Sequence, residues 1–154
     1  MGKISSCLTA LTAIALVGWS FTAPAGAEPA PADLAGASEA VQTYINATNN
    51  VDVRLMRATV CGRLAAATSV GTDEQVRQVM QSQRDLVGLA HIEVLHPVEL
   101  GSPPGQVDLL AQLTSEHHPQ DPGSNGINLV YHTEKVNGSW KVCHARNEGH
   151  LDEP

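Results

Sequence analysis

Histidine and cysteine are the residue types of this chain that could bind a metal ion or act as nucleophiles. The chain has seven histidines and three cysteines. His117 and His118 are adjacent, so their rings point apart in an extended segment, and only Glu116 and Asp121 could add to a weak surface site. No His-x-x-x-His helix, Cys-x-x-Cys pair, phosphate-binding loop or Ser-His-Asp order accompanies them. The sequence therefore predicts no metal, no cofactor and no catalytic residue.

The first 27 residues decide how the cysteines are interpreted. After a basic start, Leu8–Val17 is an apolar stretch, and a small-x-small cleavage site ends at Ala27, as is typical of a signal peptide spanning residues 1–27. The stretch is too short for a spanning helix, so no stable membrane insertion is expected. Cys7 precedes the stretch, whereas a lipidated cysteine would follow it. We expect a secreted protein, extracellular or in the cell envelope, without lipid.

Cys61 and Cys143 would then remain in a compartment where disulfides persist. An even pair of cysteines in a secreted chain indicates a bridge. A redox pair is the alternative, although neither cysteine lies in a Cys-x-x-Cys motif. We predict a disulfide between the second helix and the last strand. It would close a loop of about 80 residues, worth about 4 kcal/mol in the chain-entropy model.

Charge and composition exclude several classes of function. The formal net charge is −7, and loss of Lys3 with the signal peptide makes it −8. Basic residues are scattered, which argues against binding to nucleic acid or to anionic membranes. Only Tyr44, Tyr131 and Trp140 remain as aromatic residues after cleavage, so the core must be aliphatic. The remaining 127 of 154 residues suit a single domain. The expected parts are a flexible tether at 28–36, the domain at 37–147 and a disordered tail at 148–154.

The helical spacing of apolar residues predicts three helices. The first begins near Ala37 and ends at Asn49. Asp52 can cap the second. Thr72 opens a capping box for the third, which Gly88 ends. The expected apolar faces are Val41, Tyr44, Ile45 and Thr48 in the first helix, Val53, Met56, Val60 and Leu64 in the second, and Val76, Val79, Met80, Leu86 and Val87 in the third.

After Gly88 the pattern changes to alternation, which predicts four antiparallel strands at 91–100, 107–113, 127–136 and 139–146. Pro97 places the first strand at an edge or a bulge. Asn137-Gly138 is a strong hairpin signal between the last two strands. His96 falls on the apolar side of the first strand and is expected to be a hydrogen-bonded core residue. That side would consist of Ile92, Val94, His96, Val98 and Leu100.

Three helices followed by four antiparallel strands form an α+β arrangement. The run Val41-Gln42-Thr43-Tyr44-x-x-Ala47-x-Asn49-x-x-Asp52 is similar to the opening of the nuclear-transport-factor-2-like (NTF2-like, cystatin-like) superfamily. The ending Asn137-Gly138-Ser139-Trp140-Lys141-Val142-Cys143 resembles the last hairpin of small secreted actinobacterial, mycobacterial-type members of unknown function. The resemblance implies three helices packed on a curved sheet that leaves a cone-shaped cavity.

The resemblance also implies a pocket, which Tyr44, Trp140 and Tyr131 could line. Steroid isomerases of this superfamily place a tyrosine on the first helix as an oxyanion donor, and Tyr44 matches that position. They also use a carboxylate base soon after the second helix, where this chain has Cys61-Gly62-Arg63.

The expected function is therefore a secreted, non-catalytic domain that binds a small apolar ligand or an envelope protein, with the oligomeric state, including a dimer, left open. The alternative is a secreted steroid-isomerase-like or polyketide-cyclase-like enzyme that uses Tyr44 in the pocket.

Overall fold

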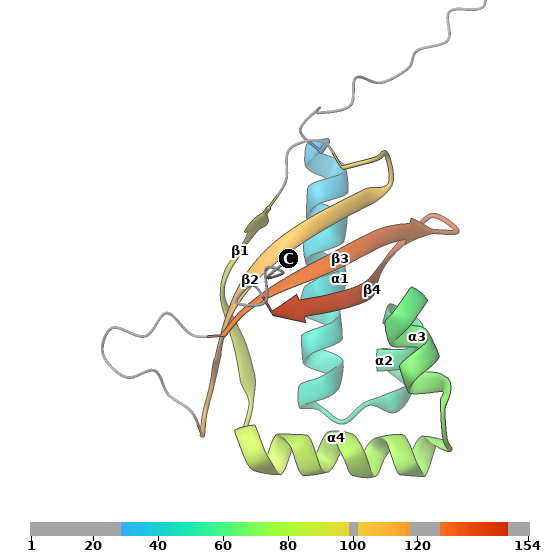
Figure 1. Cartoon of the computed structure of the whole chain (residues 1–154), viewed down its shortest axis with the longest axis vertical. Coiled ribbons are helices and arrows are strands. Elements are labelled where there is room, and N and C mark those ends of the chain that lie inside the picture. The colour runs from blue at the N-terminus through green and yellow to red at the C-terminus, as the bar shows by residue number, and fades with distance from the viewer. Residues whose placement is uncertain (1–28, 99–101, 118–126, 148–154) are drawn as a thin grey trace, which may run out of the picture.

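The structure, a computed structural model, describes residues 29–98, 102–117 and 127–147. The predicted signal peptide, Cys7, His118, Asp121 and the tail from residue 148 lie outside the described residues. Four helices precede an antiparallel sheet, an α+β arrangement (Figure 1). The elements are α1 (Pro31–Asn49), α2 (Val53–Thr59), α3 (Gly62–Ser69), α4 (Asp73–Val87), β1 (Ala90–Pro97), β2 (Gln106–Ser115), β3 (Ile127–Val136) and β4 (Ser139–Asn147).

Helix α1 is longer than predicted, because it begins at Pro31 within the expected tether. A proline suits the first turn of a helix, where its missing N–H needs no partner, and the alanines that follow favour the helix. The helix ends at Asn49, as predicted. Its buried residues are Ala37, Ala40, Val41, Ile45 and Ala47. Within the described ranges, no helix is long and apolar enough to cross a membrane.

The single helix predicted after Asp52 is in fact two helices, α2 and α3. The backbone is extended at Val60 and Cys61, where Val60 forms a parallel bridge with Val142 of β4. The Cys61 N–H donates a hydrogen bond to the Val142 carbonyl oxygen at 2.9 Å. Gly62 then turns the chain at a φ of +48°, which favours glycine. Pairing with β4 therefore overrides the helical pattern of the sequence.

The predicted caps of α2 and α4 are present. Asp52 Oδ1 accepts a hydrogen bond from the Leu55 N–H at 2.9 Å. Thr72 Oγ1 accepts from the Gln75 N–H at 3.3 Å, and Gln75 Oε1 accepts from the Thr72 N–H at 2.8 Å, which completes a capping box. Gly88 ends α4 with a φ of +78°.

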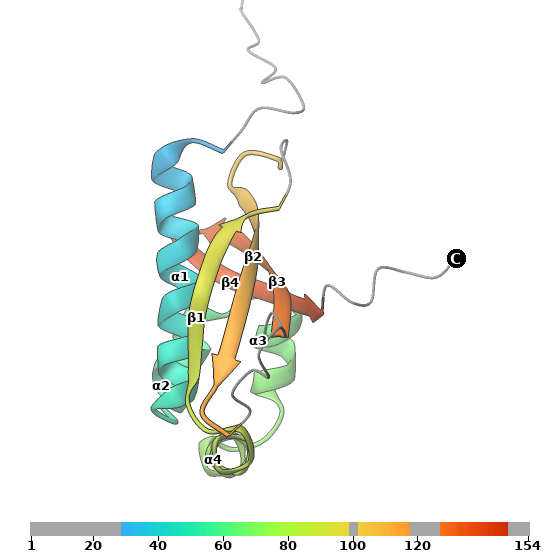
Figure 2. The ribbon, with the colours of Figure 1, turned by 90° about the vertical axis from the view of Figure 1, so that its left-hand side faces the viewer.

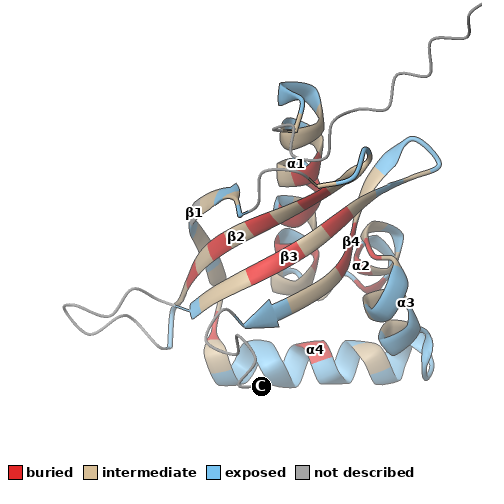
Figure 3. Cartoon of the chain, turned by 45° about the horizontal axis from the view of Figure 1, so that its top comes forward, coloured by how far each residue is buried: buried red, intermediate tan, exposed pale blue. Residues whose placement is uncertain are grey.

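Helix α4 lies across one end of the layer formed by α1 and the sheet (Figures 1 and 2). Its predicted apolar face is only partly buried: Met80 is 8% exposed, whereas Val79 is 67% and Leu86 69% exposed. Figure 3 shows the same helix as largely exposed. The helix therefore keeps apolar side chains at the surface that a fully packed helix would bury.

The sheet has the strand order β1-β2-β3-β4, all antiparallel, and α1 covers one of its faces (Figure 2). Asn137 and Gly138 both have positive φ, as expected for the predicted two-residue hairpin turn. The inward positions of β2 alternate as predicted and pack against α1. These core residues are Val107, Leu109, Ala111 and Leu113.

The predicted alternation of β1 is wrong, although Pro97 does lie in an edge strand as predicted. A register shift between Ile92 and Val94 inserts an extra residue, and such a bulge moves the following side chains to the other face. Ile92 and Leu95 therefore both pack against the core. His96 is exposed and is not the core residue that the sequence predicted.

Candidate functional site

A cavity of about 220 Å³ lies between the C-terminal half of α1, the C-terminal half of α4 and the inner face of the sheet. All four strands contribute to its wall, because each has an inward-facing residue near this end. The lining residues are Tyr44, Ile45, Thr48, Asn49, Met80, Gln83, Arg84, Val87, Gly88, Ala90, Leu113, Leu129, Tyr131 and Ala145. We call this space the sheet cavity.

A second hollow of about 400 Å³ lies on the other side of α4, against α1, α2 and the end of α3. It shares Tyr44, Thr48, Met80 and Gln83 with the sheet cavity, so the two spaces adjoin along α1 and α4. Its remaining wall is mostly apolar and includes Val79, which is largely exposed. We call this space the helix groove.

Two tyrosines meet in the sheet cavity, and sequence analysis named both. The rings of Tyr44 and Tyr131 pack edge to face, with centroids 6.1 Å apart and an interplanar angle of 64°. Burial raises the pKa of the Tyr44 hydroxyl. Burial, followed by the nearby Tyr44, raises the pKa of the Tyr131 hydroxyl. Both hydroxyls are therefore neutral at physiological pH and can donate a hydrogen bond.

Two other polar side chains of the lining are occupied within the fold. Asn49 anchors the start of β1: its Nδ2 donates to the Ala90 carbonyl oxygen at 2.8 Å, and its Oδ1 accepts from the Ala90 N–H at 3.0 Å. Thr48 Oγ1 donates to the Ile45 carbonyl oxygen at 2.8 Å. These bonds hold both side chains in place, and the Thr48 hydroxyl has no further proton to donate.

Trp140, the third predicted pocket residue, lies outside the sheet cavity and the helix groove. Its indole packs against α1 at Gly36, where an added β-carbon would lie 2.3 Å from Trp140 Cδ1. Lys135 Nζ is 5.9 Å from the ring centroid and 3.3 Å from Asp33 Oδ1. The structure therefore brings Tyr44 and Tyr131 together and separates Trp140 from them.

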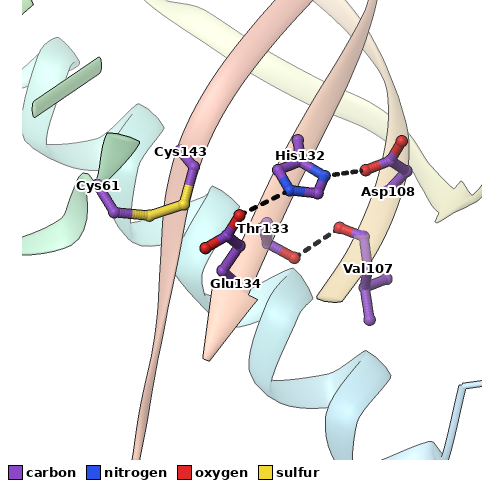
Figure 4. Close-up of a disulfide and its surroundings, with 7 residues drawn as sticks. All are labelled: Cys61, Val107, Asp108, His132, Thr133, Glu134 and Cys143. Carbon is purple, nitrogen blue, oxygen red and sulfur yellow. Dashed lines mark hydrogen bonds and ion pairs between the residues drawn. A yellow bond between two sulfur atoms is a disulfide. The ribbon is translucent and has the colours of Figure 1, made fainter. Parts of the chain in front are cut away.

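The predicted disulfide is present. Cys61 and Cys143 are joined, and their Cα atoms are 4.2 Å apart (Figure 4). Cys61 lies between α2 and α3 rather than inside a helix, so the bridge fixes the break between these helices to β4.

The outer face of the sheet holds a charged cluster that sequence analysis did not identify. His132 Nδ1 is 2.5 Å from Asp108 Oδ1, and its Nε2 is 3.0 Å from Glu134 Oε1 (Figure 4). Arg146 lies 3.8 Å from the other Asp108 oxygen. Partial burial alone would lower the pKa of His132, but the hydrogen bonds and charges of Asp108 and Glu134 outweigh it and raise the pKa.

The alternating pattern could have placed Asp108, His132 and Glu134 on outward positions of two strands. Their pairing could not be derived, because β2 and β3 are joined by a long segment that fixes no register, unlike a tight turn. Both nitrogens of His132 already face carboxylates, so the ring is not free to act as a base. Among the described residues, no group of three or more His, Cys, Asp or Glu side chains could hold a metal ion.

No protein-family model and no curated protein sequence matches the chain. Ten chains of solved structures match it. One is a protein of unknown function with a cystatin-like fold from Nostoc punctiforme, with a TM-score of 0.53 and 14% sequence identity. The alignment covers 78% of this chain and 92% of that chain. At this identity the likeness shows the fold alone: the chain has a cystatin-like α+β fold.

Proposed function

We propose that this domain binds a small apolar ligand in the sheet cavity and does not catalyse a reaction. The observation that carries the proposal is the cavity itself, which lies between α1, α4 and the sheet. Most of its lining is aliphatic or aromatic, with a few polar groups, which is the usual composition of a small-molecule site.

The lining also supports binding over catalysis. An isomerase of the steroid type needs a carboxylate or another base within hydrogen-bond reach of the substrate. Of the described residues, none that lines the sheet cavity is Asp, Glu or His. The Tyr44 hydroxyl forms no hydrogen bond to a carboxylate among the described residues, so it lacks the partner that such an enzyme would need.

The incomplete burial of α4 favours binding of a ligand. This helix forms one wall of the sheet cavity, yet Met80 is its only buried residue. A ligand in the cavity would contact Met80 and the half-buried Val87 of this helix, and each buried CH₂ group contributes about 0.8 kcal/mol. Binding should therefore stabilise the folded protein as well as fill the cavity.

We also propose that the domain acts outside the cytoplasm and is related to small secreted actinobacterial proteins. The disulfide supports this proposal, because such bonds persist in oxidising compartments. The signal-peptide pattern of residues 1–27 and the resemblance of the last hairpin point the same way. Mass spectrometry of the exported protein tests the proposal: a chain that begins near Glu28 is expected, and an intact Met1 or a lipidated Cys7 would contradict it.

The binding proposal is tested with 1-aminoanthracene, a neutral probe whose fluorescence rises in apolar surroundings. We expect saturable binding at one site per chain. Ala145→Phe places a large side chain in the cavity and should weaken probe binding at least tenfold. Ala66→Phe is the matched control, because Ala66 is exposed on α3 and lines neither space, and it should leave binding unchanged.

Two results would contradict the proposal. One is the absence of saturable binding by the unmodified protein. The other is equal binding by Ala145→Phe and the unmodified protein, provided that circular dichroism shows the variant folded. Turnover of steroid or polyketide-like ketones that is lost in Tyr44→Phe would favour the isomerase instead.

A further inference from the structure

The sheet cavity differs in charge from the rest of the chain. The protein has 16 acidic and nine basic residues, for a formal net charge of −7. Among the described residues that line the cavity, Arg84 is nevertheless the one charged residue, and none carries a carboxylate. A positive charge at this cavity, in an otherwise acidic protein, is complementary to an anionic ligand.

Arg84 is available to such an anion. It lies in the last turn of α4, and among the described residues it forms no ion pair, unlike Arg57 and Arg77. Glu116 lies at the same end of α4, but one of its carboxylate oxygens accepts a hydrogen bond from the Leu89 N–H at 3.1 Å. Glu116 is therefore bound at Leu89 and not paired with Arg84.

The two tyrosine hydroxyls of the sheet cavity add donors to this guanidinium, and the Gln83 side chain adds an amide. Tyr44 of α1 and Tyr131 of β3 both line the cavity, and their hydroxyls, with raised pKa values, stay protonated at neutral pH. Protonated hydroxyls and a guanidinium together suit a group with several acceptor lone pairs, such as a carboxylate. A neutral hydrocarbon would form no hydrogen bond with any of these donors.

The helix groove supplies room for an apolar chain next to this polar end. Within the described part of the chain, its lining contains no ionisable group other than the shared Tyr44 hydroxyl, and Met56, Val76 and Met80 give it an apolar wall. Because the two spaces adjoin, a single elongated molecule could place its charged end in the sheet cavity and its chain in the groove.

We propose that the ligand is a single-chain carboxylate, whose carboxylate is held by Arg84 with the tyrosine hydroxyls and whose alkyl chain lies along α4 in the helix groove. This inference rests on the proposed function and specifies the chemical class of the ligand. It assigns Arg84 a role in selectivity that no sequence pattern indicated.

The test compares dodecanoate with dodecanol, which have the same chain length and differ in charge. The affinity of each compound is measured by its displacement of bound 1-aminoanthracene at pH 8 and low salt. We expect dodecanoate to bind about tenfold more tightly, because hydrogen bonds to charged groups are stronger than neutral ones. In Arg84→Gln the ratio of the two affinities should fall towards one. Arg77→Gln is the matched control on the same helix, and it should keep the ratio.

The outcomes separate this inference from the proposed function. If both ligands bind equally to the unmodified protein, or if Arg84→Gln keeps the preference, the carboxylate assignment is wrong while apolar binding stands. If neither ligand displaces the probe, or if Ala145→Phe binds both as well as the unmodified protein does, the proposed function fails as well. A preference that also falls as salt rises supports the charge contribution, since salt screens an exposed arginine.

Discussion

Removing the disulfide should lower stability without changing the fold. In the double variant Cys61→Ala/Cys143→Ala, the hydrogen bond from the Cys61 N–H to the Val142 carbonyl remains, because it uses backbone atoms only. The native arrangement of β4 and the break between α2 and α3 should therefore persist. The loss arises mainly in the unfolded state, which gains the freedom that the bridge removed.

The magnitude follows from the length of the closed loop. The two cysteines are 82 positions apart in the chain. For a loop of this size the chain-entropy relation gives about 4.5 kcal/mol at room temperature, and loss of apolar contacts by the buried Cys143 adds a smaller amount. For a domain of this size such a loss lowers Tm by on the order of 15 °C.

The assay is urea unfolding followed by circular dichroism, for the oxidised protein, the double variant and the oxidised protein after reduction. We expect the unfolding free energies of the variant and of the reduced protein to agree within about 1 kcal/mol, because both lack the cross-link. A loss below about 1 kcal/mol in both would refute the reasoning. Two free thiols in the oxidised protein would refute the bridge itself.

Three further perturbations test the account elsewhere in the molecule. His132→Gln removes an imidazole whose pKa is raised in the folded protein, so its stabilising effect should be full below about pH 6.5 and decline as pH rises through the raised pKa. Unfolding free energies measured from pH 5 to 9 should show the stability of the variant approaching that of the unmodified protein as pH rises. A stability difference that widens with pH would contradict this sign. Met80→Ala should cost about 2–4 kcal/mol in unfolding free energy, whereas the exposed Val79→Ala should cost less than about 0.5, and equal losses would mean that α4 is not anchored by Met80. Gly36→Ala should destabilise the protein despite the better helix propensity of alanine, because the new β-carbon would clash with Trp140; a higher Tm would show that the indole moves aside freely.

Local signals predicted the parts of the fold that depend on neighbours in sequence. The capping box at Thr72, the cap at Asp52 and the turn at Asn137-Gly138 use residues three positions apart or fewer, and all are present. The alternation of β2 likewise needs only one buried and one open face.

Long-range pairing explains the features that sequence analysis missed. The helix predicted through Val60 breaks because this residue pairs with Val142 of β4. The bulge after Ile92 reverses the expected side of His96; Pro97 allowed for a bulge in this strand, but it did not place one between Ile92 and Val94. Helical periodicity identified the apolar residues of α4, but it could not show that the rest of the domain is too small to cover Val79 and Leu86.

The candidate site was predictable only in part. Sequence analysis named Tyr44 and Tyr131, because aromatic residues are few and the resemblance implied a pocket. It placed Trp140 with them, since the sequence does not show that β4 carries this residue to the other end of α1. Arg84 was missed because it lies among the polar positions of α4, and only the tertiary structure puts it beside the cavity.

The most direct test of the central claim is to locate a bound apolar ligand by NMR of ¹³C-labelled methyl groups during titration with 1-aminoanthracene. We expect saturable shifts of the methyl signals of Met80, Leu113 and Leu129, which line the sheet cavity. We expect no shift for Leu110 and Val130, which lie on the outer face of the sheet. Shifts confined to the outer face, or none that saturate, would contradict the claim that the sheet cavity binds an apolar ligand.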